Sequence, residues 1–299
     1  MSVVPASSLA AGAVDWRDRL LAYLALTKPR IIELLLITTV PPMVLAARGW
    51  PGSWLVVATL IGGTLSAAGA NALNCYLDRD IDLVMRRTSR RPLPRHQISA
   101  PAALRFGIGL GILGLLWLAA LVNLTAAFIS TAALLFYVMV YTRWLKRSTD
   151  QNIVIGGAAG AAPALVGWAA VTGNVGLPAW VLFAIVFYWT PPHFWALALR
   201  YQADYASAAV PMMPVVRGVE ATTRQMLAYA GLTALASLLL IPVAGMGWIY
   251  LLSAISLGAW LVWETWLVSR RPARAMMLFI YSTYYLALLF GAVMIDALI

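Results

Sequence analysis

Three oxygen-bearing side chains recur every four residues at the end of a long apolar run. Asn74, Asp78 and Asp82 stand in the stretch NALNCYLDRDID (71–82). At about 3.6 residues per turn, positions i, i+4 and i+8 lie along one face of a helix, spread over roughly 12 Å of its axis. Asp80 falls on nearly the opposite face, so we do not expect it to share a ligand with the other three. Carboxylates beside hydrocarbon are costly, which makes this cluster the strongest functional signal in the chain.

The chemistry of these side chains suits a hard cation. Mg²⁺ takes oxygen ligands in proteins, usually one or two carboxylates together with water and substrate phosphate. Asn74, Asp78 and Asp82 therefore predict a site for a divalent cation and a phosphate group. The alternative is a solvated helix end whose acids pair with neighbouring arginines.

Basic residues follow the acids directly, in a segment where Pro92 and Pro94 break the helix. Guanidinium groups bind phosphate oxygens through charge-assisted hydrogen bonds, so this loop can follow a diphosphate. A second basic group ends a later apolar run on the same side of the molecule. The alternative is a loop that is basic only because it faces the cytoplasm. The candidate substrate contacts in the two groups are Arg86, Arg90, Arg91, Lys146 and Arg147.

Another acid follows the sixth predicted span, in the stretch RYQADYASAAVPMMPVVRG (200–218). Asp204 would supply a second metal site that faces the first, and its neighbour Tyr205 is a candidate substrate contact. Metal ions on both sides of a diphosphate stabilise it as a leaving group while its C–O bond breaks. An ordinary loop acid is the alternative for Asp204.

Membrane-spanning helices must hold these residues. The chain has 299 residues, of which 62% are hydrophobic and 11% charged. About 20 apolar residues span a bilayer as a helix. We therefore predict an all-α integral membrane protein with a single domain over 1–299, of which 1–26 form an N-terminal cytoplasmic segment. Nine spans are expected near 31–47, 54–77, 103–122, 124–142, 153–172, 179–199, 225–245, 248–267 and 276–297, with the division of 103–142 at Asn123.

The distribution of charge predicts the orientation of this bundle. The net charge is +10, and with nine spans every Lys and Arg except Arg48 falls on one side. Positive charge marks the cytoplasmic face, so we expect the N-terminus inside and the C-terminus outside. The net positive charge is then explained by the membrane topology and by contact with anionic lipid, and no nucleic acid partner is expected. Residues 1–26 lack a secretory signal, so a bacterial inner membrane is the simplest location.

The chain resembles the UbiA-type intramembrane prenyltransferases, and within that superfamily the protohaem IX farnesyltransferases, or haem O synthases. The Asn-x3-Asp-x3-Asp pattern of 74–82 looks like the first motif of the superfamily. TPPHFWALALR is the most specific stretch, because quinone-type prenyltransferases do not usually carry it. The closer likeness lies in LTKPRIIELLLITTV (26–40), NCYLDRDIDLVMRRTSRRPLP (74–94), YTRWLKRSTDQNIVIGGAAGAAPALVGWAAVTG (141–173), TPPHFWALALR (190–200) and DYASAAVPMMPVV (204–216).

This resemblance implies a nine-helix bundle around a central cavity, with the acids at its cytoplasmic mouth. It implies that farnesyl diphosphate, protohaem IX and water give haem O and diphosphate, with a later haem-modifying enzyme or oxidase assembly as a possible recipient. The first motif is intact, whereas Ala208 replaces a second Asp that is often present, and Gln202-Ala203 stands where a Lys is common before Asp204. The implied catalytic and metal-binding residues are Asn74, Asp78, Asp82 and Asp204.

His193 is the candidate haem contact. It lies inside a predicted span beside Pro191 and Pro192, where an interrupted hydrogen-bond ladder would expose backbone carbonyls. Imidazole is a common ligand of haem iron, so axial ligation is one interpretation. A hydrogen-bonded interior histidine that orients the substrate or the helix is the other.

Three residues have less specific expectations. Glu33, just inside the first span, is expected to pair with a nearby cation such as Lys28 or Arg30. His96 lies in the basic loop and is expected to be solvated. Cys75 faces away from the acids and is expected to pack; as the one cysteine of the chain it can form no intrachain disulfide.

Other functions fit part of this sequence. A prenyltransferase acting on a quinone or chlorin precursor would carry the same acidic motif. Transporters place coupling ions near the midplane on broken helices, whereas these acids lie with arginines at one interface. A haem-binding assembly protein without catalysis is a weaker alternative. The acids favour an enzyme, and the TPPHFW stretch favours haem as its acceptor.

Overall fold

The computed structural model describes residues 16–29, 32 and 37–299, and all regular secondary structure in these ranges is helical. Eight helices in the described part are long and apolar enough to cross a membrane. The remaining predicted span, 31–47, is described only in part, as α3 (Val40–Ala47). The eight are α4 (Ser53–Leu77), α6 (Ala100–Leu121), the continuous α7 (Leu124–Leu135), η1 (Phe136–Leu145) and α8 (Lys146–Ser148), α9 (Asn152–Thr172), α10 (Leu177–Arg200), α13 (Gly218–Ala244), α14 (Trp248–Arg270), and η2 (Pro272–Arg274) with α15 (Ala275–Leu298).

The spans begin and end at residues with recognisable signals. Asn123 caps α7 by accepting a hydrogen bond from the Ala126 amide at 2.8 Å, which confirms the predicted division of 103–142. Gly173 and Gly245 end α9 and α13 with φ of 71° and 61°, the left-handed conformation that glycine adopts at low cost.

Three short helices were not predicted from the sequence: α1 (Trp16–Thr27), α11 (Gln202–Ser207) and α12 (Met213–Val216). A fourth, α5 (Arg79–Val84), carries on the helical face that the spacing of Asn74, Asp78 and Asp82 predicts. α1 covers the end of the predicted cytoplasmic segment 1–26, and it packs against α4 through Ala22 and Leu26. α11 and α12 have too few residues to show a helical period in the sequence.

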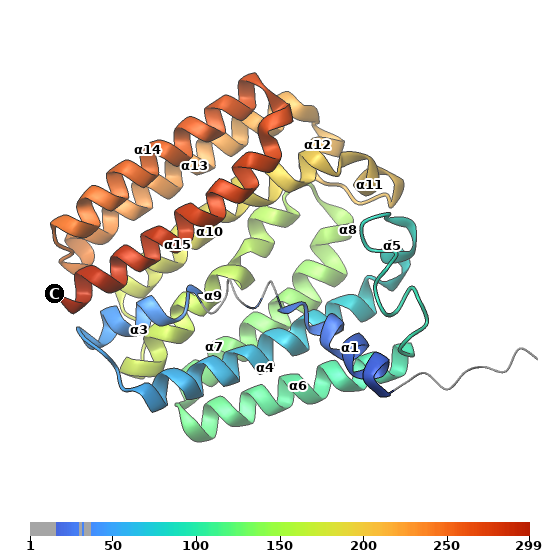
Figure 1. The fold of residues 1–299 in the computed structure, drawn as a ribbon, viewed down its shortest axis with the longest axis horizontal. Helices are drawn as coiled ribbons and strands as arrows, with labels where there is room; N and C mark the ends of the chain where they lie inside the picture. Colours follow the sequence, from blue (N-terminus) through green and yellow to red (C-terminus); the bar gives the residue numbers. More distant parts are fainter. Residues whose placement is uncertain (1–15, 30–31, 33–36) are drawn as a thin grey trace, which may run out of the picture.

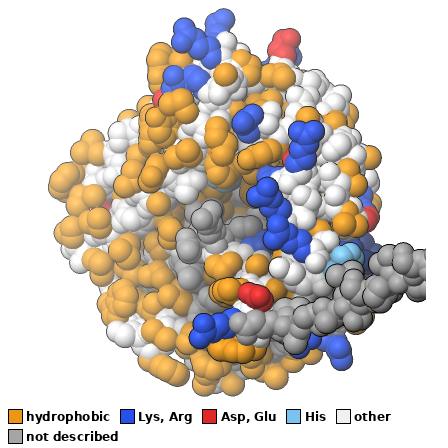
Figure 2. All heavy atoms as spheres, turned by 45° about the vertical axis from the view of Figure 1, so that its right-hand side comes forward, with side chains coloured by type: hydrophobic (Ala, Val, Ile, Leu, Met, Phe, Trp, Pro, Cys, Tyr) orange, Lys and Arg blue, Asp and Glu red, His pale blue; other side chains and the backbone are white. Residues whose placement is uncertain are grey.

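The two ends of the bundle differ in charge. α5, α8, α11 and α12 gather at one end, and α3 and the C-terminus lie at the other (Figure 1). Lys and Arg side chains stand over the first of these, hereafter the basic end, while hydrophobic side chains dominate the flanks (Figure 2). Arg48 follows α3 at the opposite end, where it hydrogen-bonds the Ala244 carbonyl. The fold thus separates Arg48 from the basic loops, as the charge distribution predicts.

The largest buried apolar cluster ties the C-terminal helices to α10. Trp195, Tyr250, Tyr285 and Phe290 are fully buried in it. The hydroxyl groups of its tyrosines are satisfied: Tyr250 donates to the Ser237 carbonyl, and the Tyr285 hydroxyl lies 2.9 Å from that of Ser237. Buried tyrosines require such partners, and they fix how these helices face each other.

Glycines let α4 and α6 approach each other closely. A Cβ added to Gly69 would lie 2.8 Å from the carbonyl oxygen of Gly107 and 2.8 Å from the amide nitrogen of Gly111. Small residues at such contacts let the backbones of membrane helices pack together, which is a main source of their association in lipid. The contact matters for the site because α4 ends in the acidic motif.

Gly69→Ala should therefore lower the midpoint of thermal unfolding of the detergent-solubilised protein. The added methyl group must push two backbones apart, and overpacking of this kind costs about 1–3 kcal/mol. Gly109→Ala is the matched control on α6, because a Cβ there meets nothing within 4 Å. Equal midpoints for the two variants would show that the bundle does not depend on this close approach.

Candidate active site

The three residues of the acidic motif all lie inside the protein. Asn74, Asp78 and Asp82 are 3%, 1% and 2% exposed. α4 ends at Leu77, but the Asp78 amide donates to the Asn74 carbonyl and the Asp82 amide to the Asp78 carbonyl, at 2.9 and 2.8 Å. The helical path therefore continues into α5, and the three residues keep one face. The side chain of Asp80 is 61% exposed, which confirms that it points elsewhere.

Cations from two other segments neutralise the buried carboxylates. The Lys146 ammonium lies 2.5 Å from Asp78 Oδ2. Arg91 donates from Nη1 to both oxygens of Asp82, at 2.9 and 2.8 Å. An ionised carboxylate is stable at such a position only with a paired charge and hydrogen bonds. Lys146 and Arg91, both predicted substrate contacts, thus lie at the acids.

A third cation, Lys28, approaches from the end of α1. Its ammonium donates to Asn74 Oδ1 at 2.5 Å, and its backbone adopts the left-handed conformation with φ of 53°. Burial lowers the pKa of the Lys28 ammonium. From the sequence, Lys28 was expected only as a partner for Glu33, which lies outside the described residues. The signal that could have identified it is a lysine at the start of an apolar run in LTKPR.

The fourth span reaches the acids through a π-helix. Asn74 donates from Nδ2 to Asp78 Oδ2 at 2.8 Å and to the Thr142 hydroxyl at 3.1 Å. Thr142 lies in η1 and itself donates to the carbonyl of Tyr137, five residues earlier. π-helical turns are rare and occur frequently at functional sites. The local sequence carries no pattern that predicts one here.

Arg147 contacts both the exposed and the buried acid. It donates to the two oxygens of Asp80 at 2.7 and 2.8 Å and to the Leu77 carbonyl at 2.9 Å. Arg147 Nη2, the nitrogen that donates to the Leu77 carbonyl, also lies 3.9 Å from Asp78 Oδ1. The hydrogen bonds from Arg147 lower the pKa of Asp80 to about 2, so Asp80 stays ionised at neutral pH.

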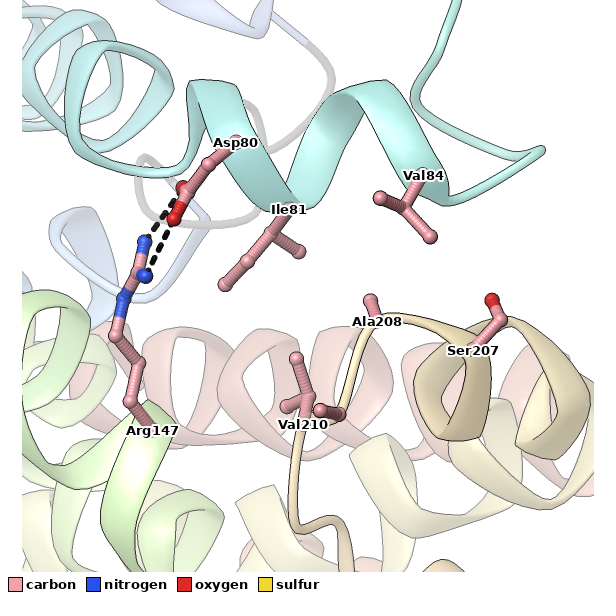
Figure 3. A pocket seen from close by; sticks show the side chains of 8 residues that line it. Asp80, Ile81, Val84, Arg147, Ser207, Ala208 and Val210 are labelled. Atoms are coloured by element: carbon pink, nitrogen blue, oxygen red, sulfur yellow. Dashed lines mark hydrogen bonds and ion pairs between the residues drawn. The ribbon is translucent and has the colours of Figure 1, made fainter.

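A pocket of about 430 Å³ opens beside this ion pair. Asp80 and Arg147 form one side of it, and Ile81 and Val84 project into it from α5 (Figure 3). The segment 207–210, at the end of α11, forms the opposite wall. The three buried residues of the acidic motif do not line the pocket. Arg147 therefore reaches both the pocket and the neighbourhood of Asp78.

The second acidic segment is joined to the basic loop through Arg87. Asp204 Oδ2 accepts a hydrogen bond from the Arg87 backbone amide at 3.0 Å. The Arg87 guanidinium lies 5.6 and 6.0 Å from the ring centroids of Tyr201 and Tyr205, and it donates to the Tyr205 hydroxyl at 3.4 Å. Within the described residues Asp204 makes no contact with the first acidic motif, so its role as a metal ligand stays a prediction. Arg87 belongs to the basic loop that was expected to follow a diphosphate, but it was not singled out as a candidate contact.

The remaining basic candidates lie outside the buried cluster. Arg86 and Arg90 are exposed, and neither side chain contacts Asn74, Asp78 or Asp82 in the part of the chain that the structure describes. His96 is also exposed, as predicted for a solvated residue. Cys75 is 2% exposed and packs in an apolar cluster with Leu26, which confirms its expected packing role.

His193 is buried at a contact between α10 and α15. Its ring stacks between Trp189 and Phe279, with centroid distances of 4.2 and 4.3 Å, and its Nδ1 lies 2.8 Å from the Ser282 hydroxyl. α10 stays helical through Pro191 and Pro192, although neither proline has an N–H for the backbone ladder, as predicted. Each proline removes a single N–H donor, and the surrounding turns remain helical.

The oxygen atoms of this site fit a hard divalent cation whose remaining ligands come from the substrate. Asp78 Oδ1 is buried and has no hydrogen-bond partner, which leaves an acceptor free for a ligand. Asn74 and Asp82 add oxygen atoms that Lys28 and Arg91 now contact. The described residues contain no group of three or more His, Cys, Asp or Glu able to hold a metal. A cation here would therefore need Asn74 and substrate oxygens as well, the mode typical of Mg²⁺ with phosphates.

Arg91→Met should destabilise the folded protein, because it leaves the buried Asp82 carboxylate without a partner. Breaking a buried ion pair costs about 3–5 kcal/mol, and the partial exposure of Arg91 places the expected loss near the lower end. Denaturant unfolding in mixed micelles would measure it.

Two controls separate this effect from the loss of a positive charge. The double variant Arg91→Met with Asp82→Asn should recover most of the lost stability. Arg224→Met removes an exposed pair with Glu220 and should change stability by less than about 1 kcal/mol. Equal effects at positions 91 and 224 would contradict the assignment.

Comparison with known proteins places this geometry in context. Residues 35–294 match the UbiA prenyltransferase family. The chain is 55% identical over 283 residues to the "Protoheme IX farnesyltransferase" of Clavibacter michiganensis subsp. michiganensis, covering 93% of this chain and 92% of the relative. It is 53% identical over 302 residues to the protein of the same name from Parafrankia sp., covering 99% and 95%.

Solved structures share the fold at low sequence identity. A digeranylgeranylglyceryl phosphate synthase superposes with a TM-score of 0.77 at 18% identity, covering 94% of this chain and 99% of the other. A UbiA homologue from Archaeoglobus fulgidus, bound to DMAPP and Mg²⁺, gives a TM-score of 0.63 at 17% identity, covering 91% and 98%. The helical arrangement is thus that of known membrane prenyltransferases.

Proposed function

The chain belongs to the UbiA prenyltransferase family, and from this premise we propose that it transfers a farnesyl group from farnesyl diphosphate to a vinyl group of protohaem IX. Addition of water completes the reaction, which gives haem O and diphosphate. The observation that carries the proposal is the buried cluster of Asn74, Asp78 and Asp82, surrounded by cations at one end of an apolar bundle. The names of relatives that are more than half identical support haem as the acceptor.

The cations of the cluster are the groups that would bind the diphosphate. Lys28, Arg91, Lys146 and Arg147 each contact an oxygen of the motif or of its helix, and a diphosphate would offer them stronger acceptors. Asn74, Asp78 and Asp82, with Asp204 from the facing segment, would hold Mg²⁺, which when bound supplies positive charge next to the leaving group. Arg86, Arg90 and Tyr205 remain proposed contacts at the rim.

The protein then has to position the two substrates and to stabilise the charge of the leaving diphosphate. The C–O bond of the allylic diphosphate breaks, and its electron pair leaves with the diphosphate, which the basic side chains stabilise. A vinyl carbon of the porphyrin attacks the farnesyl carbon, and water captures the resulting cation and releases a proton. Tyr137 and Tyr141, stacked at 5.4 Å in the span that contacts Asn74, are suited to stabilise the farnesyl cation by about 1–2 kcal/mol each.

The protein is a multi-pass membrane protein, and we propose that its basic end faces the cytoplasm of a bacterial inner membrane. Every Lys and Arg outside the spans except Arg48 belongs to that end by the topology of the chain. Farnesyl diphosphate would enter there with its charged group at the acids and its chain in the apolar interior. His193 lies in the apolar part and is the proposed contact for haem.

Membranes containing this protein, incubated with protohaem and farnesyl diphosphate, should yield a porphyrin heavier by one farnesyl group and one hydroxyl group. Mass spectrometry detects the product, and omission of farnesyl diphosphate is the control. Parallel incubation with 4-hydroxybenzoate tests a quinone-type acceptor, and release of diphosphate excludes simple transport. Prenylation of 4-hydroxybenzoate without any change in the haem would overturn the proposal.

Asp78→Asn should lower turnover by about 10²–10³-fold, since it removes the charge and weakens the acceptor that anchor the site. Binding of haem should survive, because no haem contact is assigned to Asp78. Glu220→Gln, at a side chain that is 91% exposed, is the control and should leave turnover unchanged. Normal turnover in Asp78→Asn would refute the proposed metal–diphosphate site.

A further inference from the structure

The surroundings of His193 fix its ring in both position and direction. Trp189 and Phe279 cover the two faces of the imidazole, with interplanar angles of 21° and 24°. The Trp189 indole N–H donates to the backbone carbonyl of Ser282 at 2.7 Å, so α10 and α15 are tied together at the same level. The ring cannot tilt without breaking these contacts. Its edge, where the two nitrogens lie, is the part left for chemistry.

The hydrogen bonds of Ser282 determine where the imidazole proton lies. The Ser282 hydroxyl donates its single proton to the Phe279 carbonyl at 2.9 Å. With its proton on that carbonyl, the hydroxyl oxygen is available to accept a hydrogen bond from His193 Nδ1, which lies 2.8 Å away. A neutral imidazole carries one proton, so a proton on Nδ1 leaves Nε2 with a free lone pair.

We propose that Ser282 is a positioning residue that keeps the proton of His193 on Nδ1, so that Nε2 presents its lone pair to the iron of the bound porphyrin. The proposal rests on haem being the acceptor substrate. A histidine that ligates a metal commonly donates its other N–H to a fixed oxygen atom, which sets the tautomer and the ring direction. Ser282 has this relation to His193.

The depth of the pair suits a porphyrin bound below the acidic cluster. His193 lies about two turns before the end of α10 at Arg200, and Ser282 about two turns after the start of α15 at Ala275, so both sit roughly 10 Å inside the basic end. Asn74 lies within one turn of the end of α4. The iron would thus be held in the apolar layer while the diphosphate is held at the mouth.

The test measures iron ligation in the purified full-length protein with ferric and ferrous protohaem. Optical and resonance Raman spectra report axial histidine, and titration gives the dissociation constant. Ser282→Ala should weaken haem binding by about 10-fold or more and alter the iron–histidine vibration. Ser282→Thr, which retains a hydroxyl, should restore both. His193→Ala should abolish the histidine signature.

Thr283→Val is the matched control. The Thr283 hydroxyl donates to the same Phe279 carbonyl at 3.1 Å, so the variant removes a similar bond one residue away. It should leave the haem spectrum unchanged. Iron-free protoporphyrin IX is the second control, because it has no metal to ligate. The affinity for iron-free protoporphyrin IX should be the same for the wild type and Ser282→Ala. That result would exclude a general loss of porphyrin binding.

The outcomes separate this inference from the proposed function. A histidine signature that persists in His193→Ala, or a haem spectrum and affinity unchanged in Ser282→Ala, overturns the inference even if membranes farnesylate haem. A ligation that depends on His193 and Ser282 upholds it, and absence of a farnesylated product would then count against the proposed reaction alone. Equal losses for haem and iron-free porphyrin in Ser282→Ala would show a structural role and also overturn it.

Discussion

An ionised carboxylate at the edge of hydrocarbon must be met by charge and hydrogen bonds, and this requirement organises the functional end of the protein. Asp78 and Asp82 are almost inaccessible to solvent, yet each has a cationic partner. Those partners come from the end of the fourth span and from the loop after α5. The acids therefore act as a point at which distant segments converge, and the geometry of the basic end follows from satisfying them.

The cations of these pairs are also the groups that a bound diphosphate would attract. Lys28, Arg91 and Lys146 now contact oxygen atoms that a divalent cation would take, while a diphosphate would attract these cations in turn. The pairing of these charges limits the cost of burying them. Asp78 Oδ1 is buried without a hydrogen-bond partner, so this acceptor is available to a ligand.

Two regions of different polarity divide the work of the proposed reaction. In that reaction the basic end would provide the charges that hold and stabilise a leaving diphosphate. The contact between α10 and α15 provides an apolar setting in which a single imidazole is clamped between two aromatic rings. Arg87 joins the basic loop to α11 and so connects the first acidic segment to the second. Each region is fixed by contacts between helices that are far apart in the chain.

Much of this organisation was accessible from the sequence. Apolar runs located eight of the nine predicted spans, with most ends within four residues, because a helix needs about 20 apolar residues to cross the bilayer. The spacing of Asn74, Asp78 and Asp82 predicted their shared face, since helical periodicity is a local property. The charge distribution separated Arg48 from the other basic residues. Asn123 marked a helix start through its own capping hydrogen bond.

Partners across the bundle were decided only by the tertiary structure. Lys28 contacts Asn74, Arg87 contacts Asp204, and Ser282 contacts His193, although no local pattern links any of these pairs. The π-helical turn that brings Thr142 to Asn74 was equally invisible. A sequence period shows which face of a helix is polar. Which residue that face meets depends on how the helices are rotated and shifted against one another, and this is set by the packing of the whole bundle.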